Sequence, residues 1–583
     1  MNLPMKSPYE IDPITLEVLR GQLDSVVNEA QDVLLRSSFS TIVTEGGDAT
    51  VALHDERGRT ISQACGIPIH LGTLGILGRR FAEVYPEGTA KEGDLYLIND
   101  PYDGGTHLPD FAVAAPIFFD DRLIGYITSM THHQDIGGVA PGSLAPNPYD
   151  LLAEGLRIPM VCLAAAGKKN VDLISLLMAN SRSPRNIKGD LDAQIASCRT
   201  GELRFQTVFE RLGWETTQRG LNALLDYSEK LTRAAIEQIP DGEYECEDWL
   251  DDDGLSADAP PVKVRCKIKV RGSDVEFDFT GTDPQVRSSI NCVPSSTLSA
   301  VYFVIRAVTG DQAPNNDGCF RPISVVMPEG SLVNPDFPAP VAARGVGLLR
   351  VSDVVFGAMA KAIPQKMVAA GSGHTTVIPA GGFDATTGER FIGTMGGPLR
   401  SGTGTRSAKD GIDVCDHGLS NAFHIPLEIA ESRLPIRYRR LQLWRDSGGA
   451  GTWRGGLGFV NEVEWLRGEA LMTFRLERQK FHPFGIVGGG DAPLCRLEIT
   501  RADGSAEDIY GKAVTTVRRG DVVTIWSTGG GGYGNPLRRN PQSVVEDVLD
   551  ERVSREAASD SYGVVMHGSR LDMDATSLLR MGP

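Results

Sequence analysis

The sequence predicts an α+β protein built from several regions, and three observations support this. The chain has 583 residues, more than one ordinary domain of roughly 100–200 residues contains. Hydrophobic residues make up 41% and charged residues 23% of the chain, a composition typical of a folded globular protein. Helical and strand-like hydrophobic patterns alternate in the first half, whereas the second half is rich in glycine and short strand patterns.

These changes in pattern divide the chain into five expected regions. In chain order they are a mixed α+β region, a helical region, a mixed α/β region, a β-rich region, and a tail that is helical and then disordered. Their expected boundaries are 1–165, 166–240, 241–435, 436–540 and 541–583.

The first expected element is a helix that begins at Asp12-Pro13. Aspartate is a good N-cap, and proline is favoured at the first helical position. Hydrophobic residues then recur at three- and four-residue steps from Leu16 to Leu34, which predicts a single buried face. Short strand patterns follow at 49–54 and 94–98.

A β-hairpin is expected over residues 111–130, because two hydrophobic strand patterns are joined there by a short polar turn. If the turn centres on Asp120 and Asp121, Asp110 faces Thr131 across the hairpin. Facing Cα atoms in an antiparallel pair lie about 5 Å apart. The residues just before the hairpin and those just after it are therefore expected to meet.

The remaining elements follow from the same periodicities. An acidic run over 241–253 is interpreted as a solvated face or linker. A strictly alternating pattern predicts a second hairpin over 262–279. Helices are expected at 171–178, 190–211, 217–238, 297–308 and 350–362, and strands at 459–466, 470–476, 497–501 and 522–526.

Glycine is over-represented, with 66 residues or roughly 11% against about 7% in average usage. The glycine clusters over 448–458, 488–490 and 529–534 lack the lysine of a phosphate-binding loop, and none lies between a strand and a helix in the dinucleotide-binding pattern. We interpret them as tight turns and expect no nucleotide site in this chain. The nine cysteines form no CxxC pair, which predicts dispersed, reduced thiols.

The net charge of −17 argues against nucleic acid and anionic membrane surfaces as partners. No hydrophobic stretch is long enough for a transmembrane helix. The N-terminal residues lack the apolar core of a signal peptide, so we expect a cytoplasmic protein.

Histidines and aspartates gather at both ends of the 111–130 hairpin. His107 and Asp110 stand before it, and His132, His133 and Asp135 stand after it. Two imidazoles and a carboxylate form a mixed nitrogen and oxygen set that suits Zn²⁺, Mn²⁺ or Fe²⁺. The alternative is that these groups only form hydrogen bonds within a loop network, and the sequence does not decide whether His132 or His133 is the ligand.

Other residues join this hypothesis. Asp48, in a glycine-flanked turn before a strand, is a candidate fourth ligand, and Asp135 is a candidate general base or a partner of a ligand. His70 lies in a hydrophobic stretch and is interpreted as a core or pocket-lining residue. His417 and His424 flank a loop and are candidate substrate-binding residues.

Several long motifs resemble the signature of the hydantoinase B/oxoprolinase family, and the likeness runs from about residue 10 to residue 537. The motifs lie at 99–110, 132–138, 154–159, 314–322, 446–456 and 529–536. The resemblance implies the B-type subunit of an ATP-dependent amidohydrolase, such as N-methylhydantoinase, that acts on a cyclic amide. It also implies a hetero-oligomer in which a separate hydantoinase A-type kinase subunit uses the ATP.

The resemblance further implies site residues. His107, Asp110 and His132 correspond to the family's metal ligands, and Asp48 to its early aspartate, although this chain has Gly-Asp-Ala-Thr at 47–50 where the family usually has Arg-Asp-Phe-Ser. Asp135 or His133 is then available to accept a proton. The alternative function within the family is the large subunit of an acetone or acetophenone carboxylase acting on a ketone, and a third is a non-catalytic scaffold for the kinase subunit. The chain length favours the hydrolase.

Overall fold

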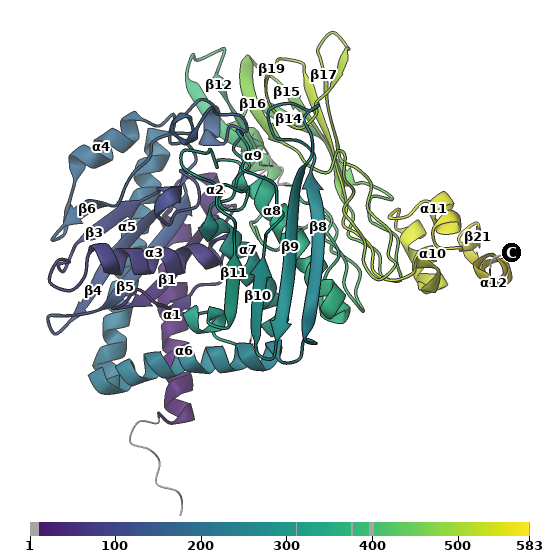
Figure 1. Ribbon diagram of the computed structural model, residues 1–583. Coiled ribbons are helices and arrows are strands. Elements are labelled where there is room, and N and C mark those ends of the chain that lie inside the picture. Colours follow the sequence, from purple (N-terminus) through teal and green to yellow (C-terminus); the bar gives the residue numbers. More distant parts are fainter. Residues whose placement is uncertain (1–10, 311, 375–376, 396–400, 582–583) are drawn as a thin grey trace, which may run out of the picture.

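The structure, a computed structural model, describes residues 11–310, 312–374, 377–395 and 401–581. It confirms the α+β class. A first lobe is built on a seven-stranded antiparallel sheet with the strand order β2-β1-β5-β4-β3-β6-β7 (Figure 1). Its strands are β1 (Ala49–Asp55), β2 (Thr60–Gln63), β3 (Leu95–Ile98), β4 (Asp110–Phe119), β5 (Arg122–His132), β6 (Val161–Ala165) and β7 (Lys168–Lys169).

Helices cover both faces of this sheet. The helices α1 (Pro13–Ser37) and α5 (Pro184–Leu212) pack on one face, and α3 (Leu71–Val84) packs on the other. This explains why β4 is an almost continuous hydrophobic run, since both its faces are buried. As predicted, Asp12 caps α1 by accepting hydrogen bonds from the backbone of Ile14 and Thr15. The shorter α2 (Thr41–Thr44) and α4 (Val171–Ala179) complete the lobe, and α6 (Trp214–Ile236) leads into the next lobe.

The second lobe has a four-stranded sheet with the order β11-β10-β9-β8, and α7 and α8 form its core with that sheet. The predicted second hairpin is confirmed as β9 and β10. The acidic run is not a linker, because it forms β8, which pairs with β9 along its whole length. These elements are β8 (Gly242–Leu250), β9 (Val262–Arg271), β10 (Asp274–Asp278), β11 (Ile323–Val326), α7 (Pro294–Thr309) and α8 (Arg344–Ala362).

The β-rich lobe consists of two sheets with a shared hydrophobic core and the short helix α9 (Leu427–Arg433). The sheet orders are β13-β12-β16-β19 and β14-β15-β20-β17-β18. The strands are β12 (Ile378–Phe383), β13 (Arg390–Met395), β14 (Ile436–Leu443), β15 (Phe459–Trp465), β16 (Glu469–Arg475), β17 (Arg496–Thr500), β18 (Ala506–Asp508), β19 (Lys512–Arg518) and β20 (Val522–Ser527).

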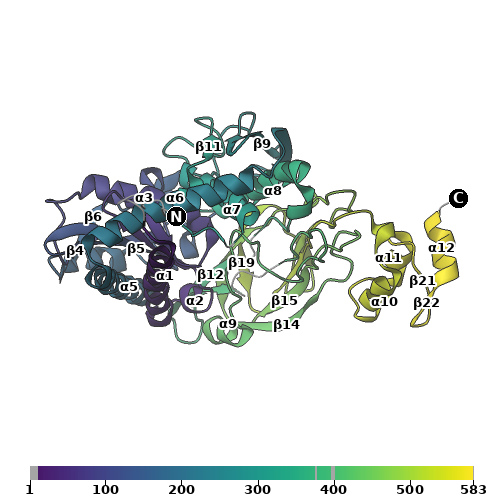
Figure 2. The same ribbon diagram turned by 90° about the horizontal axis from the view of Figure 1, so that it is seen from below.

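The C-terminal segment projects from the far side of the β-rich lobe (Figures 1 and 2). Where the sequence predicts a helix followed by disorder, the structure has three helices and a small hairpin, which form their own hydrophobic cluster. The elements are α10 (Pro541–Leu549), α11 (Arg555–Asp560), β21 (Val565–His567), β22 (Arg570–Asp572) and α12 (Met573–Met581).

Most glycines of the clusters are not turn residues, so the interpretation as tight turns is wrong for them. In the clusters at 448–458 and 529–534, only Gly534 has a positive φ. Their backbones instead lie against one another: a Cβ atom added to Gly455 would lie 1.9 Å from the carbonyl oxygen of Gly530. Glycine is needed here because any side chain would push these two segments apart.

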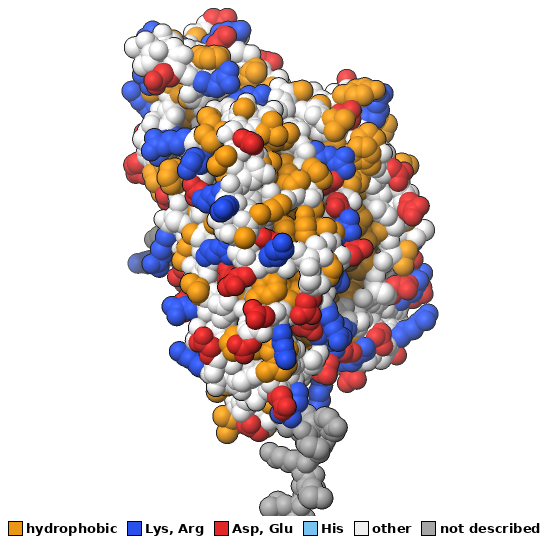
Figure 3. Space-filling model, turned by 90° about the vertical axis from the view of Figure 1, so that its left-hand side faces the viewer, with side chains coloured by type: hydrophobic (Ala, Val, Ile, Leu, Met, Phe, Trp, Pro, Cys, Tyr) orange, Lys and Arg blue, Asp and Glu red, His pale blue; other side chains and the backbone are white. Residues whose placement is uncertain are grey.

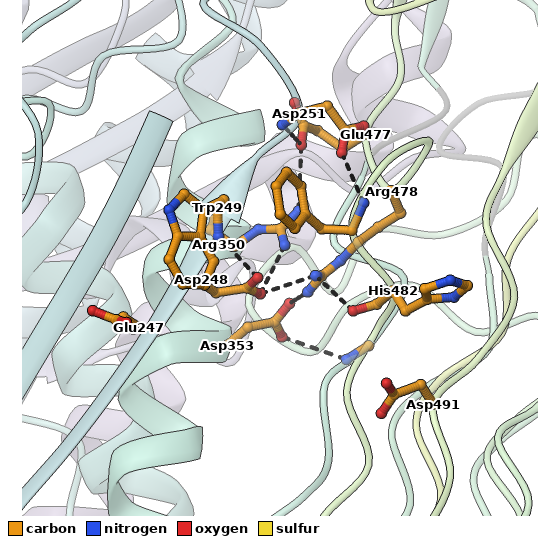
Figure 4. Close-up of polar contacts among 12 residues, drawn as sticks. Glu247, Asp248, Trp249, Asp251, Arg350, Asp353, Glu477, Arg478, His482 and Asp491 are labelled. Atoms are coloured by element: carbon orange, nitrogen blue, oxygen red, sulfur yellow. Dashed lines mark hydrogen bonds and ion pairs between the residues drawn. The ribbon is translucent and has the colours of Figure 1, made fainter. Parts of the chain in front are cut away.

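A buried charged network joins the second lobe to the β-rich lobe (Figure 4). The Arg350 guanidinium contacts Asp248 at 2.7 Å and Glu477 at 3.3 Å. Arg478 contacts the same Asp248 at 2.9 Å and Asp353 at 2.7 Å. Asp248 stands in the acidic run, so one end of that run is a structural connection rather than a solvated face.

Figure 3 shows the side of the molecule that lies on the left in Figure 1 and carries α4. On this side, hydrophobic side chains gather around a hollow, and charged groups are scattered among them. The nine cysteines form no disulfide bond with one another. No helix in the described ranges combines the length and the hydrophobicity needed to cross a bilayer.

Candidate metal centre

The hairpin of β4 and β5 positions the candidate site. The two-residue turn has positive φ at both Asp120 and Asp121, the conformation that matches the twist of paired strands. Asp110 pairs with His132, not with Thr131 as the sequence predicts. The predicted register of the hairpin is wrong by one residue, because the register shifts between Ile117 and Phe118, where β5 contains an extra residue. The shift brings His132 directly opposite Asp110.

Three potential ligand atoms converge at this end of the hairpin. The distance from His107 Nε2 to Asp110 Oδ1 is 3.0 Å, and from His132 Nδ1 to Asp110 Oδ1 it is 3.2 Å. The two imidazole nitrogens are 3.2 Å apart. Ligand atoms about 2.0–2.2 Å from one metal ion lie roughly 2.9–3.5 Å from each other at tetrahedral or octahedral angles. The triangle therefore has the size that a divalent transition metal requires, and its three buried residues could hold one ion.

The tautomer of His107 also suits metal binding. Its Nδ1 lies 3.0 Å from the carbonyl oxygen of Ala342, so Nδ1 carries the proton and donates a hydrogen bond to that oxygen. Nε2 is then left with a lone pair that points at Asp110 and His132. Burial, with a contribution from the nearby charge of Arg344, lowers the pKa of His107 to about 4, so the ring is neutral at pH 7. A backbone carbonyl that orients a histidine in this way is a common feature of metal sites.

Asp110 is kept ionised and oriented by its neighbours, including groups that contact the oxygen turned away from the two histidines. Although its burial alone would raise the pKa, the neighbouring His107 and the Arg344 guanidinium hold the pKa of Asp110 well below its usual range. Arg344 donates to Oδ2 at 2.6 Å, and the Thr106 hydroxyl donates to the same oxygen. The other oxygen, Oδ1, remains directed at the two histidines, which is the arrangement of a carboxylate ligand supported by its neighbours.

Asp48 and His70 lie at the edge of this cluster. Asp48 is outside the group of three ligand atoms, but its backbone carbonyl accepts hydrogen bonds from His132 N and Thr131 Oγ1. Burial raises the pKa of the Asp48 carboxyl group. His70 Nε2 is 3.6 Å from Asp110 Oδ2 and has no hydrogen-bond partner, while its Nδ1 lies 3.0 Å from Thr50 Oγ1.

The structure does not bring His133 and Asp135 to the cluster. The His133 ring points away, with Nε2 at 3.0 Å from Gln194 of α5 and the ring against Phe111. This geometry leaves His132 as the histidine directed at Asp110. Asp135 accepts hydrogen bonds from the backbone of Gly137, Gly142 and Arg182, and it also pairs with the Arg182 guanidinium at 3.0 Å. Their predicted roles as proton acceptors find no support in this geometry.

His417 and His424 lie on one loop that runs between a cavity and the metal centre. The cavity, of about 350 Å³, lies between α7, α8 and residues 402–418, and His417 lines it with its Nε2 at 3.4 Å from Asp353. Further along the loop, Phe423 N donates to the carbonyl of Gly46, and the Phe423 ring lies against Gly47, next to Asp48. The loop thus connects the two places, although neither histidine joins the three ligand atoms.

Sequence reasoning missed two arginines that the fold brings to this region, Arg344 and Arg475. Arg344 comes from the start of α8 and is 4% exposed, and Arg475 ends β16 and is 6% exposed. The signal available in the sequence was a charged residue within an otherwise hydrophobic helix or strand pattern, since arginine is rarely fully buried without a partner.

Comparisons with known proteins identify the family of the chain. A family model described as hydantoinase B/oxoprolinase matches residues 12–536. The chain belongs to the hydantoinase B/oxoprolinase family. The family assignment made from the motifs is thereby confirmed.

Two curated relatives match the chain over nearly its whole length. It is 34% identical over 590 residues to the B-type subunit of a putative D-/L-hydantoinase of Pseudomonas sp. (strain NS671), covering 98% of each. It is 32% identical over 578 residues to the beta chain of the caprolactamase of Pseudomonas jessenii, covering 97% of this chain and 98% of the relative.

Two solved structures have the same fold. The ATP-dependent caprolactamase from Pseudomonas jessenii superposes with a TM-score of 0.89 at 31% identity, covering 98% of this chain and 100% of the other. A nucleotide-free acetone carboxylase gives a TM-score of 0.88 at 21% identity, covering 98% of this chain and 82% of the other, and at that identity it shows the fold alone.

Proposed function

We propose that this chain is the metal-dependent catalytic subunit of an ATP-dependent cyclic-amide hydrolase of the hydantoinase or oxoprolinase type. In this proposal a separate A-type kinase subunit phosphorylates the carbonyl oxygen of the substrate, and this chain carries out the hydrolysis. The observation that carries the proposal is the convergence of His107 Nε2, Asp110 Oδ1 and His132 Nδ1 within 3.0–3.2 Å of one another.

The residues present fit a divalent ion of zinc, manganese or iron. His107, Asp110 and His132 would hold it, and Asp48, which is outside this group of three, is the candidate for a further oxygen ligand. A metal bound in such a site supplies a Lewis acid and lowers the pKa of a water molecule toward about 7. In this proposal Arg344 keeps Asp110 ionised and oriented, and His70, whose Nε2 has no hydrogen-bond partner, contacts the substrate.

The need for ATP follows from amide chemistry. An amide carbonyl is a poor electrophile because its nitrogen donates electrons into the carbonyl group, and phosphorylation of the oxygen removes this protection. The relatives named above are the B-type chain of a hydantoinase and the beta chain of a caprolactamase, which supports a partner subunit for this chain as well. The sequence shows no phosphate-binding loop of its own, which is consistent with ATP being used by that partner.

In this proposal the kinase subunit docks on α4 of the first lobe. Two hydrophobic side chains of α4 are largely exposed, Val171 at 67% and Leu176 at 52%. Hydrophobic side chains exposed together are typical of protein–protein contact sites.

The direct test is reconstitution with the A-type subunit. The purified complex would be incubated with ATP and a panel of hydantoins and lactams, and in parallel with ketones and labelled bicarbonate. We expect ring-opened acid to form together with ADP and phosphate. Label fixed into an acid-stable product would instead show a ketone carboxylase and would contradict the hydrolase. Metal-free complex that works as fast as metal-loaded complex would contradict the metal dependence.

A further inference from the structure

Arg475 is a buried cation that has no counter-charge among the residues that the structure describes. Six arginines are buried in the described part of the chain. Five of them pair with a carboxylate, and these are Arg344, Arg350, Arg454, Arg478 and Arg539. Within the described ranges the sixth, Arg475, pairs with none. Its one hydrogen bond is from a terminal nitrogen to the carbonyl oxygen of Val377 at 2.9 Å, and its Nε has no partner.

The position of Arg475 relates it to the metal centre. Arg475 ends β16, next to Val377 just before β12, and Val377 lines a small cavity together with His132. Burial and the nearby charge of Arg344 lower the pKa of Arg475 to about 10, so it remains charged at pH 7. Arg344 in turn donates to Asp110 and also has an Nε without a partner. Arg344 therefore lies against the ligand carboxylate, and Arg475, bonded to a residue of the cavity that His132 also lines, is near enough to Arg344 for the two charges to repel each other.

This arrangement is unfavourable unless an anion occupies it. A buried charge without a partner is strongly destabilising, and a second cation nearby adds repulsion. The planar guanidinium group forms paired hydrogen bonds with the oxygens of phosphate or carboxylate. The proposed function supplies such an anion, because an O-phosphorylated cyclic amide brings a phosphoryl group to the metal centre.

We propose that Arg475, together with Arg344, binds the phosphoryl group of the activated substrate beside the metal centre. This inference rests on the proposed function. The chemistry that the pair recognises is that of a tetrahedral oxyanion, which can be the phosphoryl group of the substrate or free phosphate released by the reaction.

The first experiment uses the chain alone, stripped of metal, and titrates inorganic phosphate by calorimetry. The wild-type chain should bind about one phosphate, with an affinity that changes little as salt is added, since buried charges are screened much less than exposed ones. Arg475→Met should weaken binding at least tenfold, and Arg475→Lys should lie between the two because lysine keeps the charge but not the paired geometry. The matched control, Arg437→Met, changes an exposed arginine of β14 and should leave binding unchanged.

The second experiment uses the complex with the kinase subunit and ATP. In Arg475→Met, ADP formation should continue while ring opening falls at least tenfold, so the ratio of ADP to product rises. Thermal stability separates binding from a structural role: removal of an unpaired charge should leave the melting temperature equal or higher, whereas loss of a structural contact would lower it.

The two experiments distinguish two failures. If phosphate binds the metal-free wild type and Arg475→Met abolishes this, but no cyclic amide is opened, the anion site stands and the proposed function fails. If the wild type does not bind phosphate at millimolar concentration, or if Arg475→Met binds it equally well, the anion site is refuted whatever the substrate of the complex.

Discussion

The metal centre and the interlobe network are both buried, but their charges are paired differently. In the network, Arg350 and Arg478 each contact two carboxylates, and the buried Lys512 contacts Asp252 at 2.9 Å and also Glu477. At the metal centre, Asp110 faces two histidines and one arginine, while Arg475 has no carboxylate partner in the described ranges.

The difference indicates what each region does. Buried charges that are paired within the chain connect parts of the fold, here the second lobe and the β-rich lobe (Figure 4). Buried lone pairs and cations that lie close together without partners lower the stability of the folded chain unless a bound ligand pairs with them. Unpaired polar groups at the metal centre are therefore better explained by a cation and an anion that bind there than by folding.

The largest effect is expected from removal of one ligand. His132→Ala should reduce bound metal from about one per chain to nearly none and lower turnover by more than about a hundredfold, since even changes to groups that only support a ligand cost 10–100-fold. Metal analysis of the purified variant is the measurement. The matched control is His133→Gln, which changes the adjacent imidazole that points at Gln194, and it should retain its metal. If His132→Ala retained as much metal as His133→Gln, the metal would be bound at some other site.

Breaking the network should affect stability instead of metal binding. Arg478→Met leaves Asp248 and Asp353 without one cation in a buried environment, which costs about 3–5 kcal/mol. Denaturant unfolding should show an earlier transition for this variant, with Arg437→Met on the surface as the comparison. Metal content per folded chain should stay at the wild-type level, and its loss would mean that the two regions are not independent.

A smaller effect concerns pH. Burial raises the pKa of Glu477 to about 7, although the charge of Lys512 opposes this. In the unfolded chain a glutamate has a pKa near 4.3, so between about pH 4.3 and 7 the folded chain keeps a proton that the unfolded chain has lost. Stability therefore falls as pH rises through this window, by up to about 1.4 kcal/mol per pH unit from this group, and is level above it.

Glu477→Gln directly tests whether Glu477 makes the stability fall as the pH rises. The variant cannot titrate at this position, so its unfolding free energy should decline less between pH 5 and pH 7 than that of the wild type. Denaturant titrations at several pH values provide the comparison. Parallel pH profiles for the two proteins would show that Glu477 is already ionised in the folded state and would contradict the raised pKa.

The sequence was sufficient for the parts of the site that depend on local pattern. The alternating strands and polar turn of residues 111–130 place His107, Asp110 and His132 at one end of a hairpin, and the structure agrees. The one-residue error arises from the extra residue in β5, which no pattern of hydrophobic residues reveals.

Long-range features could not be predicted. Arg344 reaches Asp110 across 234 positions, and nothing local to α8 signals that contact. The acidic run resembles a solvated segment because its exposed glutamates alternate with inward residues, yet Asp248 at its far end is buried against two arginines. The glycine clusters resemble turns because the sequence does not show that the loops lie against one another.

The proposed hydrolase depends most on one cation held by His107, Asp110 and His132. The direct measurement is anomalous diffraction from crystals of the metal-loaded chain, recorded at the absorption edges of zinc, manganese and iron. We expect a single strong peak about 2.0–2.2 Å from His107 Nε2, Asp110 Oδ1 and His132 Nδ1. No peak between these three atoms in a metal-loaded and active protein would contradict it.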